Sequence, residues 1–538
     1  MKTALFIFWM CFSLSFASIS QNYSLIKHFG SSGDDVGYAI LEADNSLYAT
    51  GWFQQTVTFG GIELTSVGDD DIFVLRMNYA GEILWAIRVG GIYEDNVVGL
   101  VGDNDGNIYI SGLCSQNADF GPTTLPGYGG ADAFICRIRD DGEVLWAVSG
   151  GGFNDDIAYR LSLSSQGDFL AFTGQYKGTA QFGTFTLPSW GGRDGFIARV
   201  DTAGFFPWVY CFGNYSDESG YGIDIDTDGA IYCAGYFFSD TLQIGTNTLV
   251  NASTDADCIL IKLNSNGEAA YAKSFGGTQE DLPRPLYVNQ NSVYIGGYHY
   301  GPGNYLGIPV SGNSQYRNSF VLKCDKSGNG IWVLDGLSTH DDELIGLSLT
   351  NDNHIVISGG FTGSMEIGSQ TFTSNGLYDA YLVNIDASTG SPLTAMTGGG
   401  SGTDIFFGTT TYSDKVLVAG FFENTAEFDT VYLVSAGLKD IVLARIEDFG
   451  IGFPDKSNQM LTVYPNPCQN EFTINFPDPS GSSYSITIHN VRGQLFGTYI
   501  QNSGSPSTID VSNFAPGLYI IQVTDGVHLP YIGKIQLL

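Results

Sequence analysis

The amino-acid sequence predicts an all-β protein: a seven-bladed β-propeller followed by a small Ig-like β-sandwich. Three observations carry this prediction. A unit of about 61 residues recurs seven times, each unit holds four short strand-like runs, and the period breaks after residue 448. Four antiparallel strands repeated around an axis make a β-propeller, an architecture with about 4–8 blades.

Two columns of residues establish the repeat. A glycine recurs every 61 or 62 residues, and an aspartate or asparagine at the start of a D-x-F-like run recurs every 61 to 63 residues. Two independent columns with one period indicate seven repeats. The glycines are Gly51, Gly112, Gly174, Gly235, Gly297, Gly359 and Gly420, and the polar column holds Asp71, Asp132, Asp194, Asp257, Asn318, Asp379 and Asp440.

The ends of the propeller are predicted from its strand count. The D-x-F strand has seven copies, but the tryptophan-type strand that follows it has six, ending in a degenerate copy at Leu393. The segment YSLIKHFG at 23–30 ends in a glycine shortly before the acidic pair Asp34 and Asp35, which is the sequence context expected of the seventh copy. We therefore expect the first strand of the chain to complete the last blade, which leaves no open sheet edge.

The remaining segments give the domain plan. Residues 1–20 have one lysine, an apolar run and small residues, the pattern of a secretory signal peptide. The propeller is expected over 21–448, a linker over 449–460, and the second domain over 461–538. Alternating apolar positions in that domain predict about seven strands.

Charge and cysteine content bound the function. The chain has 56 acidic and 22 basic residues and a formal net charge of −34, which disfavours nucleic acid and anionic membranes as partners. No segment after the signal is apolar enough to span a membrane. Seven cysteines remain after signal removal; Cys114 with Cys136, and Cys233 with Cys258, are candidates either for disulfides or for buried free thiols.

Two parts of the sequence resemble known protein families. The D-x-F and Y-x-x-G signatures over roughly 31–447 resemble the SBBP β-propeller repeats of secreted bacterial proteins. The tail is similar to the C-terminal sorting domain of the type IX (Por) secretion system. This second resemblance implies export across the outer membrane by that machinery, and then release or attachment to the cell surface. Its sorting motif falls on Tyr464, Pro465, Asn466, Pro467, Gly493, Gly517, Tyr519 and Lys534.

Repeated residues favour a structural role over chemistry. The D-x-F aspartate is expected to anchor the entry to the third strand of each blade, and the tryptophans to fill the space between blades. The acidic pairs before each first strand are either turn motifs or a ring that concentrates Ca²⁺. Asp224, Asp226 and Asp228 match a D-x-D-x-D-G calcium loop, but the twelfth position is Gly235, so a hairpin turn is favoured.

The irregular residues are the better binding candidates. Strand parity places the acidic pairs and the long connections between second and third strands on one face, the long-loop face, and binding residues concentrate on such loops. Aromatic residues there are expected either to stack on a ligand or to pack under their own loop. The candidates are Arg160, Trp190, Tyr298, His299, Tyr300, Tyr305, Tyr316 and Arg317.

These patterns favour a secreted or surface-attached scaffold that binds a glycan or a protein on its long-loop face. The alternatives are an extracellular polysaccharide hydrolase or lyase acting at the channel mouth, and a purely structural surface component. Motifs such as HExxH, GxSxG and a phosphate loop do not occur in the sequence. The acidic turns make Ca²⁺ the one cofactor that the sequence suggests.

Overall fold

The computed structural model describes residues 22–350, 353–413, 415–447, 449–450, 462–475, 483–490, 495–502, 507–524 and 531–537. The chain divides into two compact units, 1–451 and 452–538. The described regular structure is β-strand throughout, which confirms the predicted all-β class. Among these residues no helix has the length and apolarity of a membrane span. The predicted signal peptide lies outside the described residues.

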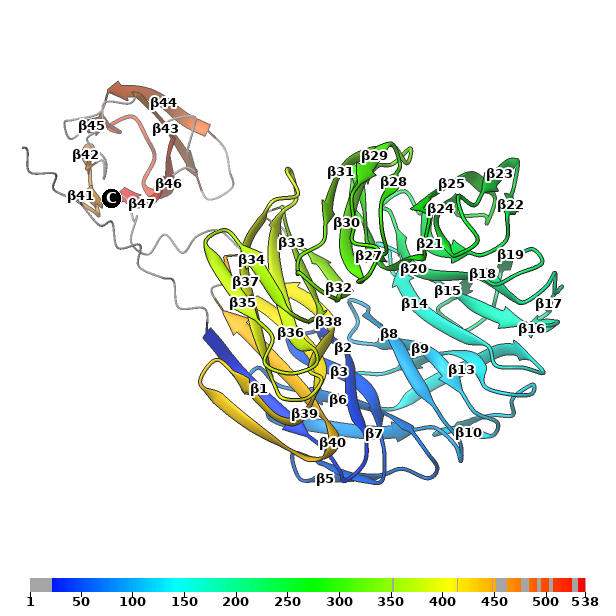
Figure 1. The fold of residues 1–538 in the computed structure, drawn as a ribbon. Helices are drawn as coiled ribbons and strands as arrows, with labels where there is room; N and C mark the ends of the chain where they lie inside the picture. The colour runs from blue at the N-terminus through cyan, green and yellow to red at the C-terminus, as the bar shows by residue number, and fades with distance from the viewer. Residues whose placement is uncertain are drawn as a thin grey trace, which may run out of the picture. The chain divides into compact units, whose positions relative to one another are not determined.

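The first unit is a ring of seven blades of four antiparallel strands (Figure 1). Each blade runs from an inner strand near the axis to an outer fourth strand. Blades one to three contain β2 (Asp35–Ala43), β3 (Ser46–Phe53), β6 (Asp71–Met77) and β7 (Ile83–Val89); β8 (Asn96–Gly102), β9 (Ile108–Cys114), β12 (Asp132–Ile138) and β13 (Val144–Gly152); and β14 (Ile157–Leu163), β15 (Phe169–Lys177), β18 (Arg193–Asp201) and β19 (Trp208–Phe212).

The other blades repeat this order. Blade four has β20 (Glu218–Ile225), β21 (Ile231–Phe237), β24 (Asp257–Leu263) and β25 (Ala269–Gly277); blade five has β26 (Asp281–Val288), β27 (Ser292–His299), β30 (Asn318–Asp325) and β31 (Gly330–Asp335); blade six has β32 (Asp342–Leu349), β33 (His354–Phe361), β36 (Asp379–Asp386) and β37 (Pro392–Gly400). Blade seven has β38 (Ile405–Tyr412), β39 (Lys415–Phe428), β40 (Val431–Glu447) and, as its outer strand, β1 (Asn22–Phe29).

The ring closes through both ends of the propeller sequence. β1 pairs antiparallel with β40, from Asn22 opposite Glu447 to Phe29 opposite Ile441. Without β1 the outer edge of β40 would present unpaired backbone groups to solvent. Tyr23 and Ile26 pack on the blade-seven core, so the closure buries apolar surface as well as pairing the edge.

The long connection between second and third strands is itself folded as a small hairpin, a feature that the sequence analysis missed. These hairpins are β4 (Thr56–Phe59) with β5 (Ile62–Thr65), β10 (Ala118–Phe120) with β11 (Thr123–Leu125), β16 (Ala180–Phe182) with β17 (Phe185–Leu187), β22 (Thr241–Ile244) with β23 (Asn247–Val250), β28 (Gly303–Tyr305) with β29 (Ile308–Val310), and β34 (Ser364–Ile367) with β35 (Gln370–Thr373). In blade seven the hairpin is the far end of β39 and β40.

A bulge recurs in every inner strand. In blade one the pairing of β2 with β3 shifts between Gly37 and Ala39, so Tyr38 drops out of the ladder, and the same shift occurs in the other six inner strands. A bulge re-aims the side chain of the extra residue. The bulge residues, which the shift leaves out of each ladder, include Tyr38, Val98, Tyr159, Tyr221, Arg284, Ile345 and Phe407.

Blades one, two, three and five are each fastened to the next by a carbonyl that accepts two side-chain donors. In blade two, Arg137 Nη1 and Trp146 Nε1 both donate to the Thr202 carbonyl of blade three, each at 3.0 Å. Blade one repeats the arrangement, with Arg76 and Trp85 donating to Asp140. The tryptophan column therefore packs between blades, as predicted, and also supplies a hydrogen bond.

The second unit contains two sheets. β41 (Thr462–Tyr464), β42 (Glu471–Asn475) and β45 (Ser507–Asp510) form one, and β44 (Leu495–Asn502), β43 (Ser483–Asn490), β46 (Gly517–Thr524) and β47 (Tyr531–Leu537) form the other. Its core includes Phe472, Ile486, Ile521 and Ile535. The seven cysteines of the described chain are all free thiols, so neither candidate disulfide forms.

Candidate ligand-binding groove on blades five and six

The inner member of each acidic pair is a buried clamp on the turn before its strand. In blade two, Asp95 Oδ2 accepts a hydrogen bond from Gly91 N, and its Oδ1 accepts one from Ser115 N at the end of β9, both at 2.6 Å. Gly91 precedes β8 and Ser115 follows β9, so these bonds join two strand ends of blade two on the long-loop face. The equivalent clamps are Asp35, Asp156, Glu218, Asp281, Asp342 and Asp404.

The D-x-F aspartate is a second clamp, as predicted. Asp132 Oδ2 accepts a hydrogen bond from Tyr128 N at 2.7 Å and so fixes the loop that enters β12. The same bond, from a residue four or five positions earlier, is made by Asp71, Asp194, Asp257, Asn318, Asp379 and Asp440. The repeated acids thus hold backbone N–H groups, which supports the turn interpretation over a calcium ring.

Side chains at the bulges cross the central channel. Tyr38 of blade one stacks on Phe407 of blade seven, with ring centroids 4.8 Å apart, and Tyr159 stacks on Tyr221 at 4.2 Å. Burial and interaction with Tyr221 raise the pKa of Tyr38 well above its usual value. Both aromatic pairs join bulge residues of neighbouring blades.

Arg160 bridges the channel at this level. Its Nη2 donates to the carbonyl of Ile345, on β32 of blade six, at 2.7 Å. Arg160 therefore joins blade three to blade six across the axis of the ring. It lines an axial cavity of about 200 Å³ together with Ser162, Asp224 and Tyr287.

Three of the blade-five candidates are buried, so their predicted role as exposed stacking surfaces is wrong. Tyr298, His299 and Tyr305 are 3%, 0% and 0% exposed. Tyr305 ends β28 with its ring turned inward, and its hydroxyl donates to Asp281 Oδ1 at 2.6 Å. Of the two sequence alternatives, packing beneath the loop is the one that the structure shows for them.

Tyr298 and Arg317 belong to a compact charged cluster. Arg317 and Arg284 bind the two oxygens of Glu343, at 3.3 and 2.8 Å. The Arg317 guanidinium lies 4.8 Å from the Tyr298 ring centroid, and Tyr300 packs edge-on against Tyr298. The two cations share one carboxylate, so this cluster mainly braces blade five against blade six.

A contact between His299 and Asp335 shapes the adjoining loop. His299 Nε2 contacts Asp335 Oδ1 at 2.8 Å, and Ser311 donates to Asp335 Oδ2 through its backbone N–H at 2.8 Å and its hydroxyl at 3.1 Å. The bonds from His299 and Ser311 outweigh burial and lower the pKa of Asp335 to about 2. Asp335 is thus a fixed anion that holds the loop from Ser311 to Gln315 in place.

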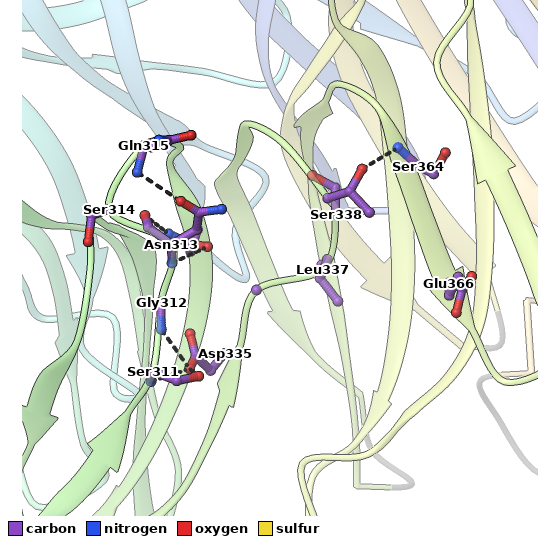
Figure 2. A pocket seen from close by; sticks show the side chains of 13 residues that line it. Ser311, Gly312, Asn313, Ser314, Gln315, Asp335, Leu337, Ser338, Ser364 and Glu366 are labelled. Atoms are coloured by element: carbon purple, nitrogen blue, oxygen red, sulfur yellow. Dashed lines mark hydrogen bonds between the residues drawn. The ribbon is translucent and has the colours of Figure 1, made fainter.

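That loop forms one wall of a groove of about 840 Å³ (Figure 2). The opposite wall comes from the connection between β31 and β32, with Leu337 and Ser338, and from Ser364 and Glu366 on β34. Leu337 is the only apolar side chain in the lining. The other lining residues are Ser311, Gly312, Asn313, Ser314, Gln315, Asn318, Asp335, Gly336 and Thr339.

The other candidates fall at separate places. Tyr316 follows the lining residue Gln315, and its ring lies 4.7 Å from that of His340, which follows the lining residue Thr339. Trp190 is 45% exposed on blade three, outside the groove lining.

The Asp224–Asp228 segment is a hairpin turn rather than a cation site. Asp224 accepts from Ser162 Oγ at 2.6 Å and from Val288 N at 2.8 Å, across two neighbouring blades. Asp226 accepts from the backbone N–H of Asp228 at 3.0 Å and from Lys326 Nζ at 2.9 Å. The carboxylates of Asp224 and Asp226 therefore serve different partners, and within the described chain no three acidic, histidine or cysteine groups are placed to hold a metal.

Two curated relatives match this chain at low identity. The chain is 22% identical to the uncharacterized WD repeat-containing protein L264 of Acanthamoeba polyphaga mimivirus, over 60% of this chain and 28% of that protein. It is 25% identical to the regulatory protein FlaEY of Caulobacter vibrioides, over 73% of this chain and 36% of that protein. The matched regions thus span about a third of these relatives.

Solved structures with a similar chain path include the quinohemoprotein alcohol dehydrogenase of Comamonas testosteroni and a europium-containing methanol dehydrogenase. The first has a TM-score of 0.40 at 12% identity and covers 84% of this chain and 79% of its own. The second has a TM-score of 0.35 at 10% identity and covers 79% of this chain and 93% of its own. Likeness at this level carries no inference about activity.

The second unit has a family match. Residues 462–536 match the secretion system C-terminal sorting domain. In the predicted sorting motif, Asn466 Oδ1 accepts from Gln536 N on β47 at 3.0 Å, and the Tyr519 hydroxyl donates to Ala515 O at 2.9 Å. Gly493 lies outside the described residues. The C-terminal unit of this chain is thus similar to type IX sorting domains, which supports export across the outer membrane to the cell surface or beyond.

Proposed function

We propose that the exported propeller is a binding scaffold and that the groove between blades five and six takes a neutral glycan. The observation that carries this proposal is the groove lining, in which hydroxyl, amide and backbone groups surround a space of about 840 Å³ with a single apolar side chain. This volume lies in the usual range of ligand pockets, about 300–1,000 Å³. Hydroxyl-rich ligands match such a lining better than flat aromatic or lipid ligands do.

Charge narrows the ligand class. The charged side chains that line the groove are the two acids Asp335 and Glu366. The whole chain carries a formal charge of −34. A polyanionic glycan would be repelled by this field, so neutral or amino sugars are the expected ligands.

The polar contacts of the groove favour binding over hydrolysis. A glycosidase needs a carboxylic acid that keeps its proton near neutral pH. Asp335 has the opposite character, since its hydrogen bonds lower its pKa to about 2. Arg160, the binding candidate nearest the axis, is engaged with the Ile345 carbonyl.

The test is a glycan array followed by calorimetric titration with the full secreted chain. We expect neutral or amino glycans to bind and sulfated or uronic glycans not to bind. Ser314 is an exposed groove residue, and Ser314→Trp should fill the space and weaken binding at least tenfold, which is about 1.4 kcal/mol. Thr124→Trp, at an exposed position on the blade-two hairpin, is the matched control and should bind normally. Equal binding by both variants would place the ligand elsewhere.

A further inference from the structure

Buried carboxyl groups meet in pairs at the junctions between blades. At the junction of blades two and three, the D-x-F Asp132 and the clamp Asp156 both face Gly151. A Cβ placed on Gly151 would lie 2.1 Å from Asp132 Oδ1 and 2.7 Å from Asp156 Oδ2. Both aspartates are at most 1% exposed. Glycine is thus required here by close approach, and the two acids share one dry space.

The arrangement recurs around the ring. A glycine faces both acids in Asp71 with Asp95, Asp257 with Asp281, and Asp379 with Asp404. In the fifth pair, Asp194 meets Gly213 and interacts with Glu218. All ten carboxyl groups are at most 2% exposed. We call these five pairs the seam pairs.

Each seam pair leaves one oxygen without a donor. In these five pairs both oxygens of the clamp acid accept hydrogen bonds. The Oδ2 of the D-x-F aspartate also accepts one, but its Oδ1 has no donor. This holds for Asp71, Asp132, Asp194, Asp257 and Asp379, whose Oδ1 atoms are buried and unpartnered. A buried acceptor without a donor is costly, and far more so when it is charged.

Few cationic side chains offset the negative charge of the seam pairs. Asp71 has Arg88 at 3.0 Å, and the Asp257–Asp281 pair faces His299 along with Glu280, Tyr305 and Cys258. The Asp194–Glu218 pair is faced by Asp217, Tyr176 and Cys211. The Asp132–Asp156 pair is faced by Asp155, Cys114 and Tyr176. The Asp379–Asp404 pair is faced by Glu423. Within the described part of the chain, no lysine, arginine or histidine forms an ion pair with the last two of these pairs.

A metal ion fits the seams poorly. Calcium takes 6–8 oxygen ligands, whereas each seam presents two carboxyl groups whose other oxygens already hold N–H donors. The space beside Gly151 is too small for a methyl group. Blade five also replaces its D-x-F aspartate by Asn318, a neutral group whose amide donates to the carbonyls of His299, Asn313 and Tyr316.

We propose that each seam pair holds one proton between its two carboxyl groups in mild acid, so that the blades pack most tightly there and loosen as the pH rises. A proton on the orphan Oδ1 of the D-x-F aspartate converts it into a donor toward the neighbouring clamp. The step is a simple proton uptake from water, and the pair then carries one negative charge instead of two. Two carboxylates confined together share a proton for this reason.

The direction of the pH effect follows from linkage. Burial, and repulsion by the paired acid, raise the pKa of Asp156 and Asp404 to about 7, and burial raises that of Asp132 and Asp379 to about 6. Unfolded aspartate titrates near 3.9. The folded chain therefore binds more protons than the unfolded chain between these values, and the free energy of unfolding falls as the pH rises from about 4 to about 7.

The test compares the full chain with the variant Asp132→Asn/Asp379→Asn. An asparagine amide donates a hydrogen bond without a titrating proton, so the variant should fold and its melting temperature should fall less between pH 5 and pH 8 than that of wild type. Calorimetric unfolding at pH 5.5 in buffers of different ionisation enthalpy should show the release of about two fewer protons. Asp105→Asn, at an exposed turn, removes a charge outside the seams and should keep the wild-type slope.

Two outcomes would overturn the proposal. One is a pH slope and proton count in the double variant equal to those of wild type. The other is a rise in the wild-type melting temperature on adding Ca²⁺ at pH 7.5 that the double variant lacks, because the seams would then hold a cation. A variant that fails to fold would be replaced by Asp156→Asn, which keeps the D-x-F clamp and is read by the same proton count.

Discussion

At the scale of single residues, repetition separates anchors from candidates for binding. The tryptophan column shows how an anchor works. Trp146 buries its ring between blades two and three and donates its indole N–H to the Thr202 carbonyl at 3.0 Å. Arg137 donates to the same oxygen from the third strand. After blades one, two and three, one carbonyl thus receives an arginine donor and a tryptophan donor from the preceding blade, which explains why the two residues occur together in these repeats.

This arrangement makes a stability prediction. Trp146→Phe keeps an aromatic ring at the interface but removes one donor, and we expect it to lower the free energy of unfolding by about 1 kcal/mol. Urea denaturation measures this loss. The effect should be small because Arg137 still satisfies the Thr202 carbonyl. Arg137→Met/Trp146→Phe, which leaves that oxygen without either donor, should lose more than the two single changes added together; strict additivity would contradict a shared acceptor.

At the scale of elements, closure of the ring depends on one strand that is far from its partner in sequence. β1 covers the outer edge of β40, so blade seven ends on a fourth strand as the other six blades do. In an antiparallel pair, alternate residues direct their N–H groups to the partner strand. Of two adjacent residues in β1, one must therefore donate to β40.

Replacing both Ile26 and Lys27 by proline should therefore remove at least one ladder bond and open the edge. We expect a lower melting temperature and concentration-dependent aggregation, because a bare strand edge recruits other chains. Light scattering during thermal unfolding measures both effects. The matched variant has alanine at the same two positions and keeps the backbone donors. If the proline pair melts and scatters like the alanine pair, β1 does not close the ring.

The blade strands could be predicted from sequence because seven copies average out local ambiguity. The hairpins between second and third strands were missed, since strands such as Ala118–Phe120 are too short to show a period of two. A recurring F-G-x-x-T-L pattern, as in 120–125 and 182–187, was the available signal. The blade-five aromatics were misplaced for the same reason: Tyr305 ends a hairpin strand, and its inward direction follows only once that strand is known.

The groove could not be predicted at all. It forms where three connections of two blades meet, and of its polar lining residues only Asn318, the asparagine of the D-x-F column, stands out in sequence. Asp335, which holds one wall, has no sequence feature that sets it apart at the end of β31. Its role depends on its contacts with His299 and Ser311. Contacts of this kind come from tertiary placement and not from local pattern.

At the scale of the whole molecule, an acidic propeller is joined to a sorting unit. The two parts are separate compact units, and only the second matches a secretion family. The propeller should therefore fold without the tail, and the tail should carry the information for export. This division makes the export role testable independently of any ligand.

Deletion of 462–538 should leave a folded propeller that stays in the periplasm of a host with type IX machinery. Fractionation with immunoblotting measures its location, and a cooperative melting transition of the purified protein confirms its fold. Fusion of the same residues to a folded periplasmic reporter should move that reporter to the surface or the medium. Normal export of the truncated chain would refute the sorting role. A truncated chain that is absent from every compartment would instead show that the tail is needed for stability, and in that case the reporter fusion still decides whether these residues direct export.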